Sequence, residues 1–172
     1  RMTAKSVQFS HACERNKQPI LEVLRGWLPP GARVLEVGSG SGQHAVYFTQ
    51  QLEGLWWQPS DLAANLPDLA ERVSGEGGRA LASGAVLAEP VALDVNQADS
   101  RPNAWDMLAR LDGVGRRGFD AVFSANTTHI MAAAAVPRLL AGAAGVLKPG
   151  GLLLLYGPFQ DRSEEHTSEL QS

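Results

Sequence analysis

Hydrophobic and polar residues alternate along the chain in blocks, some with helical spacing and others with the composition of strands. Apolar positions three or four residues apart predict helices over residues 16–28, 43–52, 62–73, 105–111 and 137–147. Short apolar runs bounded by turn residues predict strands over residues 33–37, 55–58, 90–95, 119–125 and 152–156. Strands that alternate with helices are typical of βαβ units, so the pattern predicts an α/β fold with a parallel sheet.

The same pattern makes more detailed predictions at three places. We expect Asn16 to cap the first helix, and residues 74–88, which are rich in Gly and Ala, to form a loop. The positions expected to share one face of the last helix are Val136, Leu140, Ala143 and Leu147. Strand 152–156 reads LLLLY, and we expect it to be buried on both sides.

Composition narrows the classes of function. The 172 residues suit one domain, and 15 basic against 18 acidic residues give a net charge of -3, which argues against a nucleic-acid partner. The single cysteine, Cys13, excludes an internal disulfide framework and a cysteine-based zinc site. No apolar run reaches the length of about 18 residues that a membrane span needs, and residues 1–14 lack the apolar region of a secretory signal. A cytoplasmic protein without a membrane partner is therefore predicted.

The strongest chemical signal is a glycine-rich loop between the first predicted strand and the second predicted helix. Residues 36–44 read EVGSGSGQH, so Gly38, Gly40 and Gly42 alternate directly after the strand. Glycines permit positive φ and let a ligand lie against bare backbone, although a tight turn without a ligand would use them equally well. A dinucleotide fingerprint would place a small residue at position 43, so Gln43 disfavours a nicotinamide cofactor.

Polar residues follow the other predicted strands at the edge where parallel α/β sheets bind ligands. Asp61 lies 19 residues beyond Gly42 and suits the two hydroxyls of a ribose, or a helix N-cap. Asp94 ends the third strand, where it could equally be a turn residue. Asn126 and His129 follow the fourth strand. A neutral His129 could accept a proton from a nucleophile, or it could be a histidine packed at a helix start.

Five stretches of the chain resemble one protein family. They are ERNK (residues 14–17), LEVGSGSGQHAVYF (35–48), WQPSD (57–61), FSANTTHIM (123–131) and LKPGGLLLLYGPF (147–159). Together they are similar to the methyltransferase-like protein 26 family, a set of class I methyltransferase-like proteins long labelled as a domain of unknown function. LKPGG alone is generic to class I methyltransferases, whereas the combination of QHAVYF, WQPSD and YGPF is specific.

The resemblance implies a Rossmann-like class I methyltransferase fold with a mostly parallel sheet, and S-adenosylmethionine (SAM) as the cofactor. The cofactor-binding residues that it implies are Glu36, Gly38, Gly40, Gly42, Asp61, Asp94 and Val95. The glycines would lie beneath the methionine part, Asp61 would hold the ribose, and Asp94 and Val95 would meet the adenine. Glu36 would orient the loop or the methionine amine. Asn126 and His129 would face the substrate, and no metal is implied.

The segment before the first strand folds over the cofactor in many class I methyltransferases. A cation there could pair with the methionine carboxylate. Arg15 is open to this role or to a solvated position, and we expect Lys17 to be solvated.

The expected function is SAM-dependent methyl transfer to an unidentified small-molecule or protein nucleophile. A non-catalytic scaffold that binds SAM or its product is the alternative, because no acid–base constellation stands out. An NAD(P)-binding oxidoreductase is the third reading.

The last eleven residues, 162–172, read RSEEHTSELQS, which matches the in-frame translation of a widely used sequencing adapter. We expect a non-native tail there, with an ordinary polar tail as the alternative. Residues 1–161 would then be one methyltransferase-like domain that is truncated at its C-terminal end and lacks its last strands. We expect that loss to leave strand 152–156 as an open apolar edge, which is an aggregation hazard.

Overall fold

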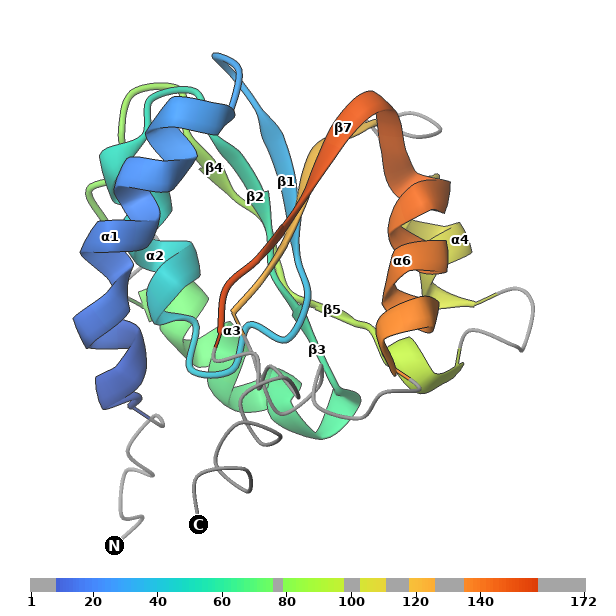
Figure 1. Cartoon of the computed structure of the whole chain (residues 1–172). Coiled ribbons are helices and arrows are strands. Elements are labelled where there is room, and N and C mark those ends of the chain that lie inside the picture. Colours follow the sequence, from blue (N-terminus) through green and yellow to red (C-terminus); the bar gives the residue numbers. More distant parts are fainter. Residues whose placement is uncertain (1–8, 76–78, 98–102, 111–117, 126–134, 158–172) are drawn as a thin grey trace, which may run out of the picture.

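A central parallel sheet crosses the protein and carries helices on both faces (Figure 1). The computed structural model describes residues 9–75, 79–97, 103–110, 118–125 and 135–157. The elements in chain order are α1 (His11–Trp27), β1 (Arg33–Glu36), α2 (Gln43–Gln51), β2 (Trp56–Gln58), β3 (Ser60–Asp61), η1 (Ala63–Asn65), α3 (Leu66–Gly75), β4 (Val86–Leu87), β5 (Val91–Ala92), η2 (Val95–Gln97), α4 (Ala104–Leu108), β6 (Phe119–Ser124), α6 (Ala135–Val146) and β7 (Leu147–Leu155).

The main sheet has the strand order β4-β2-β1-β6-β7, and β3 and β5 form a second, two-stranded sheet. Every neighbouring pair is parallel. The chain runs outward from β1 through β2 to β4, then crosses back to β6 and β7. This order confirms the predicted α/β fold with a Rossmann-like, mostly parallel sheet.

Pro59 lies between β2 and β3, and Pro90 lies between β4 and β5. Because Ser60 pairs with Val91, the two prolines interrupt neighbouring strands at almost the same level. Proline has no N–H to donate to a neighbouring strand, so the sheet breaks there into its main part and the β3–β5 tip. The buried amide of Gln58 bridges the break, because Nε2 donates to the carbonyls of Pro59 at 2.9 Å and Glu89 at 2.7 Å. Strand β2 ends at Gln58, as predicted. Beyond the break the chain continues as β3, a strand that was not predicted, and carries Asp61 beyond the main sheet.

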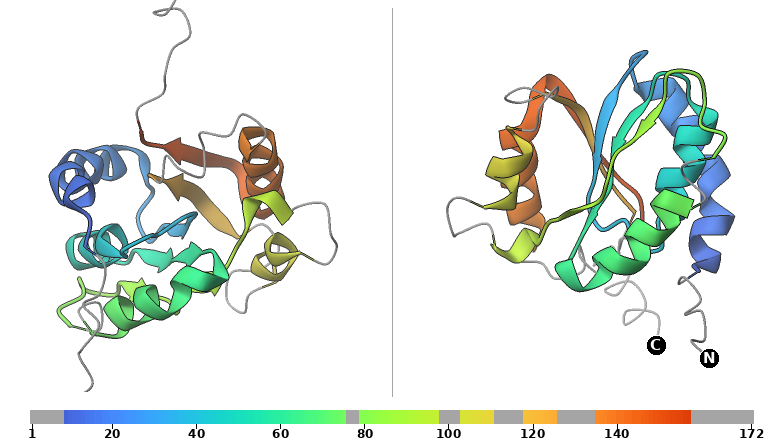
Figure 2. Two further views of the ribbon diagram at one scale, coloured as in Figure 1. Left: turned by 90° about the horizontal axis from the view of Figure 1, so that it is seen from below. Right: turned by 180° about the vertical axis from the view of Figure 1, so that it is seen from behind.

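Helices α1, α2 and α3 lie on one side of the sheet, and α4 and α6 lie on the other (Figure 2). On the first side, the fully buried ring of Trp57 lies 5.4 Å from Phe48 and 5.5 Å from Phe123, between ring centroids. On the second side, Trp105 of α4 packs with Leu139 of α6 in a separate apolar cluster. Two cores therefore hold the sheet rigid beneath the edge where the glycine loop begins.

Helix α1 begins earlier than the hydrophobic pattern predicts. Its N-cap is Ser10, whose side chain accepts a hydrogen bond from the backbone N–H of Cys13 at 3.2 Å. The prediction that Asn16 caps the helix is wrong, because residues 11–15 are mainly polar and give no periodic signal. Asn16 instead lies one turn inside the helix and directs its side chain toward α2.

The last helix turns a different face to the core than predicted. Its buried residues are Ala135, Leu139, Ala143 and Val146. Only Ala143 was expected among these, and Leu140 is 50% exposed. The helix passes directly into β7, so Leu147 is the first residue of a strand and not the end of a helical stripe.

Strand β7 is longer than predicted and is not buried on both sides. Its residues from Gly151 to Leu155 are all of intermediate exposure. The reason is its place at the end of the strand order, where it pairs with β6 alone among the described strands. None of the helices in the described ranges combines the length and apolarity needed to cross a bilayer.

Candidate functional site

The glycine loop joins β1 to α2 through three residues in the left-handed region. Gly38 has φ 72°, Gly40 has φ 56° and Gly42 has φ 77°. Side chains other than glycine rarely adopt these angles, so the predicted use of positive φ is confirmed. The loop is further fixed to β3, because Ser39 N–H donates to the carbonyl of Ser60 at 2.8 Å.

Asp61 anchors this loop from the tip of β3. The side chain is 1% exposed, and its Oδ2 accepts a hydrogen bond from Gly40 N–H at 2.7 Å. Its Oδ1 accepts from Leu62 N–H at 2.7 Å and from the amide of Asn65 at 3.0 Å. Hydrogen bonds to a carboxylate are among the stronger ones in proteins. Asp61 therefore shapes the loop before any ligand arrives, which the ribose and N-cap hypotheses alone did not anticipate.

Glu36 is a second buried carboxyl beneath the loop. Its side chain is 1% exposed, and Oε1 accepts a hydrogen bond from the indole of Trp57 at 3.2 Å. Burial is the main cause that raises the pKa of Glu36 from 4.5 to about 7, and the charge of Asp61 adds to it, against hydrogen bonds from Ser39 and Trp57. Near neutral pH this carboxyl is therefore only partly ionised.

A cavity of about 450 Å³ opens above the loop. Its walls are Ser10, Ala12, Cys13, Asn16, Glu36, Gly38, Ser39, Gly40, Ser41, His44, Asp61, Asn65, Asp68 and Ala125. Four of the predicted cofactor-binding residues meet here: Glu36, Gly38, Gly40 and Asp61. Carboxyls, hydroxyls and bare backbone dominate this lining.

The three other predicted cofactor-binding residues lie elsewhere. Gly42 faces α3, where an added Cβ would come within 2.9 Å of Leu69 Cδ1. Val95 is 4% exposed and belongs to the core cluster that also holds Trp105. Asp94 lines a second cavity and accepts a hydrogen bond from Asn96 N–H at 2.9 Å.

The second cavity has a volume of about 640 Å³ and a mainly apolar lining. Its residues include Leu62, Ala63, Leu93, Asp94 and Met107. Leu62 directly follows Asp61, so a short stretch of chain reaches from one cavity to the other. The two cavities, one polar and one apolar, therefore lie on either side of β3.

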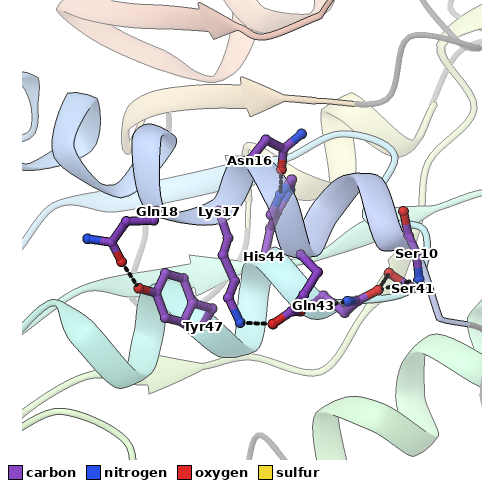
Figure 3. Close-up of polar contacts among 9 residues, drawn as sticks. Ser10, Asn16, Lys17, Gln18, Ser41, Gln43, His44 and Tyr47 are labelled. Carbon is purple, nitrogen blue, oxygen red and sulfur yellow. Dashed lines mark hydrogen bonds and ion pairs between the residues drawn. The ribbon is translucent and has the colours of Figure 1, made fainter.

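The first two turns of α1 form one wall of the polar cavity, and polar side chains fasten them to α2 (Figure 3). Gln43 accepts from Ser10 N–H at 2.6 Å and from the Ser41 hydroxyl at 2.7 Å, and its amide donates to Glu14 at 3.0 Å. One turn further along α1, the His44 ring is bonded through Nε2 to Asn16 Oδ1 at 2.7 Å.

His44 is a buried neutral imidazole. The ring is 3% exposed and stacks on Phe48 with 5.3 Å between centroids. Burial lowers the pKa of His44 from 6.5 to about 4, although a backbone hydrogen bond with Cys13 acts in the opposite direction. At neutral pH the cavity wall therefore presents this histidine as a hydrogen-bonding group without charge.

Replacing Gln43 by alanine tests whether these contacts fix α1. The change removes three hydrogen bonds, so we expect the free energy of unfolding to fall by about 1–3 kcal/mol in chemical denaturation. Gln50→Ala on the same helix is the control, because Gln50 makes one exposed contact to Arg79 and should change stability by less than about 0.5 kcal/mol. Equal effects of the two changes would contradict the assignment.

The pH dependence of stability should show opposite contributions from Glu36 and His44. The raised pKa of Glu36 means that the folded protein binds this proton more tightly than the unfolded chain, so its contribution is lost as pH rises from about 4.5 to 7. The lowered pKa of His44 gives a contribution that is lost as pH falls from 6.5 toward about 4. The two slopes oppose each other in the acidic range.

The Glu36→Gln variant separates the contributions of Glu36 and His44 to the pH dependence of stability. Relative to this variant, the original chain should lose ~3 kcal/mol of unfolding free energy between about pH 5 and pH 8, as measured by urea denaturation. His44 titrates in both proteins and cancels in the difference. The control is Glu53→Gln, which makes the same substitution at an exposed position. A Glu36→Gln difference that varies with pH no more than the Glu53→Gln difference would contradict the raised pKa of Glu36.

Sequence reasoning missed several cavity residues. The sequence analysis assigned no role in a ligand site to Cys13, His44 or Asp68, yet all three line the cavity. One signal was available: Asn16 precedes the buried Ile20 and Leu24 at intervals of four, so it extends the buried stripe of α1 with a polar residue.

The cations of α1 are not among the residues that line the cavity. Lys17 forms an ion pair with Glu14 and lies over the ring of Tyr47, 4.7 Å from its centroid. Its side chain therefore reaches from α1 toward α2 and is engaged there (Figure 3). Arg15 is exposed and does not line the cavity either.

Two predicted residues, Asn126 and His129, lie outside the described residues, and their role toward the acceptor stays a prediction. Within the described ranges, no group of three or more His, Cys, Asp or Glu side chains is arranged to hold a metal ion.

Solved structures of similar fold include SAM-dependent methyltransferases. The methyltransferase SibL, in its apo form, is 20% identical with a TM-score of 0.61, over 93% of this chain and 41% of SibL. The SAM-bound amino pentose methyltransferase of calicheamicin biosynthesis from Micromonospora echinaspora is 22% identical with a TM-score of 0.54, over 91% of this chain and 60% of that one. A methyltransferase from Thiobacillus denitrificans in complex with S-adenosyl-L-homocysteine is 19% identical with a TM-score of 0.51, over 92% and 55%.

These similarities show that the chain has the Rossmann-like fold of class I methyltransferases. The chain spans between 41% and 60% of the length of these three proteins.

A protein family matches the sequence over residues 7–170. The matched range includes most of residues 162–172, whose assignment to a non-native tail stays a prediction. Since the match covers nearly the whole chain, the protein belongs to the family described as "Protein of unknown function (DUF938)".

Proposed function

We propose that this chain binds SAM across the two cavities and belongs to a methyltransferase that transfers the sulfonium methyl group to a small-molecule or protein nucleophile. The observation that carries the proposal is the glycine loop at the floor of the polar cavity, held open by Asp61 at the tip of a Rossmann-like sheet. Parallel α/β sheets bind ligands at this edge.

The residues present fit this cofactor. An added Cβ at Gly40 would meet no atom within 4 Å, so the loop leaves open space where a ligand can approach its backbone. The polar cavity suits the amino acid and ribose parts, and the apolar cavity beyond Leu62 suits the adenine ring. Asp94 lies at that second cavity, in keeping with its predicted place near the adenine. Val95, which belongs to the core, would support the cavity from behind.

Bound SAM would supply a methyl group activated by the positive charge of its sulfonium, for transfer to the lone pair of an acceptor. The chain itself binds, orients and shields. Gly38 and Gly40 present backbone, Asp61 holds the loop and accepts from the ribose, and Glu36 lies beneath the amino acid part. The first turns of α1 exclude water from one side. Such positioning and exclusion of water are the main protein contributions to transfer between aligned partners.

Thermal unfolding with SAM, with NADH as the comparison ligand, tests the proposal. At a concentration of about 100 times the dissociation constant, SAM should stabilise the fold by about 2.7 kcal/mol. This corresponds to a rise of roughly 5–10 °C in Tm for a chain of this size, and NADH should give no rise. Cooperative unfolding that SAM does not shift would overturn the proposal. Binding without methyl transfer to any tested acceptor would favour the scaffold alternative.

Gly40→Ala locates the binding site, and Gly31→Ala is its matched control. Both glycines have positive φ, 56° and 68°, and an added Cβ meets no atom within 4 Å at either. Each change should therefore cost about 1 kcal/mol of backbone strain. Only Gly40 lines the polar cavity, so only Gly40→Ala should weaken SAM binding, by roughly tenfold or more, in isothermal titration. Equal affinities for SAM in the two variants would place the ligand elsewhere.

The finer assignment, to methyltransferase-like protein 26 relatives with an unidentified acceptor, is part of the same proposal. Its support is the set of matching stretches, of which LEVGSGSGQHAVYF and WQPSD contain Glu36, Gly38, Gly40 and Asp61. All four of these residues line the polar cavity.

A further inference from the structure

The polar cavity is bounded by carboxyls from three different elements. Glu36 ends β1, Asp61 ends β3, and Asp68 lies in the first turn of α3. Glu36 and Asp61 are each 1% exposed, so water shields their charges poorly.

No lysine or arginine among the described residues lines this cavity. The nearest cations of the surrounding helices are otherwise placed. Lys17 of α1 is paired with Glu14 outside the cavity, and Arg72 of α3 packs behind Gly42. His44, the remaining basic group of the wall, is held neutral by burial. The described lining of the cavity therefore carries net negative charge near neutral pH.

We infer that this cavity selects its ligand by charge, binding the cationic methyl donor SAM more tightly than the neutral product S-adenosylhomocysteine. The inference rests on the proposed function and adds to it a preference between two molecules of nearly the same shape. Loss of the sulfonium charge on transfer removes an attraction to Glu36, Asp61 and Asp68. The product is then released more easily, and inhibition by the product is weak.

Isothermal titration with three ligands separates charge from shape. SAM carries the methyl group and the positive charge, S-adenosylhomocysteine carries neither, and sinefungin carries an ammonium group in place of the sulfonium and cannot transfer a methyl group. At about pH 8, where Glu36 is mainly ionised, SAM and sinefungin should bind about tenfold more tightly than S-adenosylhomocysteine.

Asp68→Asn and Glu71→Gln form a matched pair of variants on α3. Both remove one negative charge from the same helix, but only Asp68 lines the cavity. Asp68→Asn should reduce the preference for sinefungin over S-adenosylhomocysteine by roughly two- to fourfold, and Glu71→Gln should leave it unchanged. Glu36→Gln should reduce it as well. Because Glu36 is buried and Asp68 is half-buried, the Tm of each variant is measured alongside its affinities.

Each of the other outcomes decides against the charge preference, and one of them also decides against the proposed function. If S-adenosylhomocysteine binds as tightly as both cations, the charge preference is wrong and the cofactor site stands. If SAM binds tightly but sinefungin does not, the methyl group and not the charge is recognised, and the inference is overturned. An equal loss of preference in Asp68→Asn and Glu71→Gln would also overturn it. If none of the three ligands binds to the folded chain, the proposed function fails and the inference fails with it.

Discussion

Asp61→Ala is expected to lower the free energy of unfolding by ~3–5 kcal/mol, a large part of the stability of a domain of this size. The change removes three hydrogen bonds to a carboxylate and leaves the Gly40 N–H without its acceptor. An unsatisfied buried donor alone costs about 1–3 kcal/mol. Chemical denaturation followed by tryptophan fluorescence measures the change, because Trp57 lies in the core below the loop.

Asp94→Ala is the matched control for this prediction. Asp94 is an aspartate near the same edge of the sheet, but its side chain makes one local hydrogen bond, to Asn96 N–H. Its replacement should cost less than about 1 kcal/mol. If Asp61→Ala were as stable as Asp94→Ala and still failed to bind SAM, Asp61 would be a ligand contact only, and the loop would be held by other groups.

Gly142→Ala is expected to destabilise the protein by ~3 kcal/mol or more, with a fall of roughly 6–12 °C in Tm. A Cβ at Gly142 would lie 2.2 Å from Cε2 and 2.5 Å from Cδ2 of Trp105. These are atoms of a rigid indole that is 5% exposed and packed in the core cluster, so it has little room to move. Helices α4 and α6 would have to separate.

Gly145→Ala, on the same helix, is expected to change the stability in the opposite direction. An added Cβ at Gly145 meets nothing within 4 Å, and alanine is the better helix former by about 0.5–1 kcal/mol. This variant should therefore unfold at a slightly higher temperature than the original chain. A fall in Tm of similar size for both variants would show that glycine itself, and not the contact with Trp105, is required in α6.

Local pattern was enough to predict the alternation of helices and strands, since most strands are short apolar runs followed by turn residues. It missed β3, and it missed β4, which lies within residues 74–88 that were expected to form a loop. It also predicted the glycine loop, because alternating glycines directly after a strand have few uses other than positive φ. Local pattern failed where a third element decides the outcome. Leu140 is exposed because the rotation of α6 is set by its contact with Trp105 and by its direct passage into β7.

The candidate site was predictable on one wall only. This wall lies at the carboxyl ends of the first two predicted strands, and parallel topology brings such positions together. Its predicted residues are Glu36, Gly38, Gly40 and Asp61. The opposite wall comes from α1, which precedes the sheet in the chain and whose placement depends on side chains such as Gln43. No spacing rule connects Asn16 with His44, so their hydrogen bond could be found only in three dimensions.

The two prolines also determine how the β3–β5 tip is attached to the rest of the protein. Because neither Pro59 nor Pro90 can donate a hydrogen bond, a break separates the tip from the main sheet. The glycine loop holds the tip instead, since Ser39 N–H donates to the Ser60 carbonyl and Gly40 N–H donates to Asp61. A ligand that spans both cavities would contact the loop and the tip together, so its binding would couple the two parts of the broken sheet.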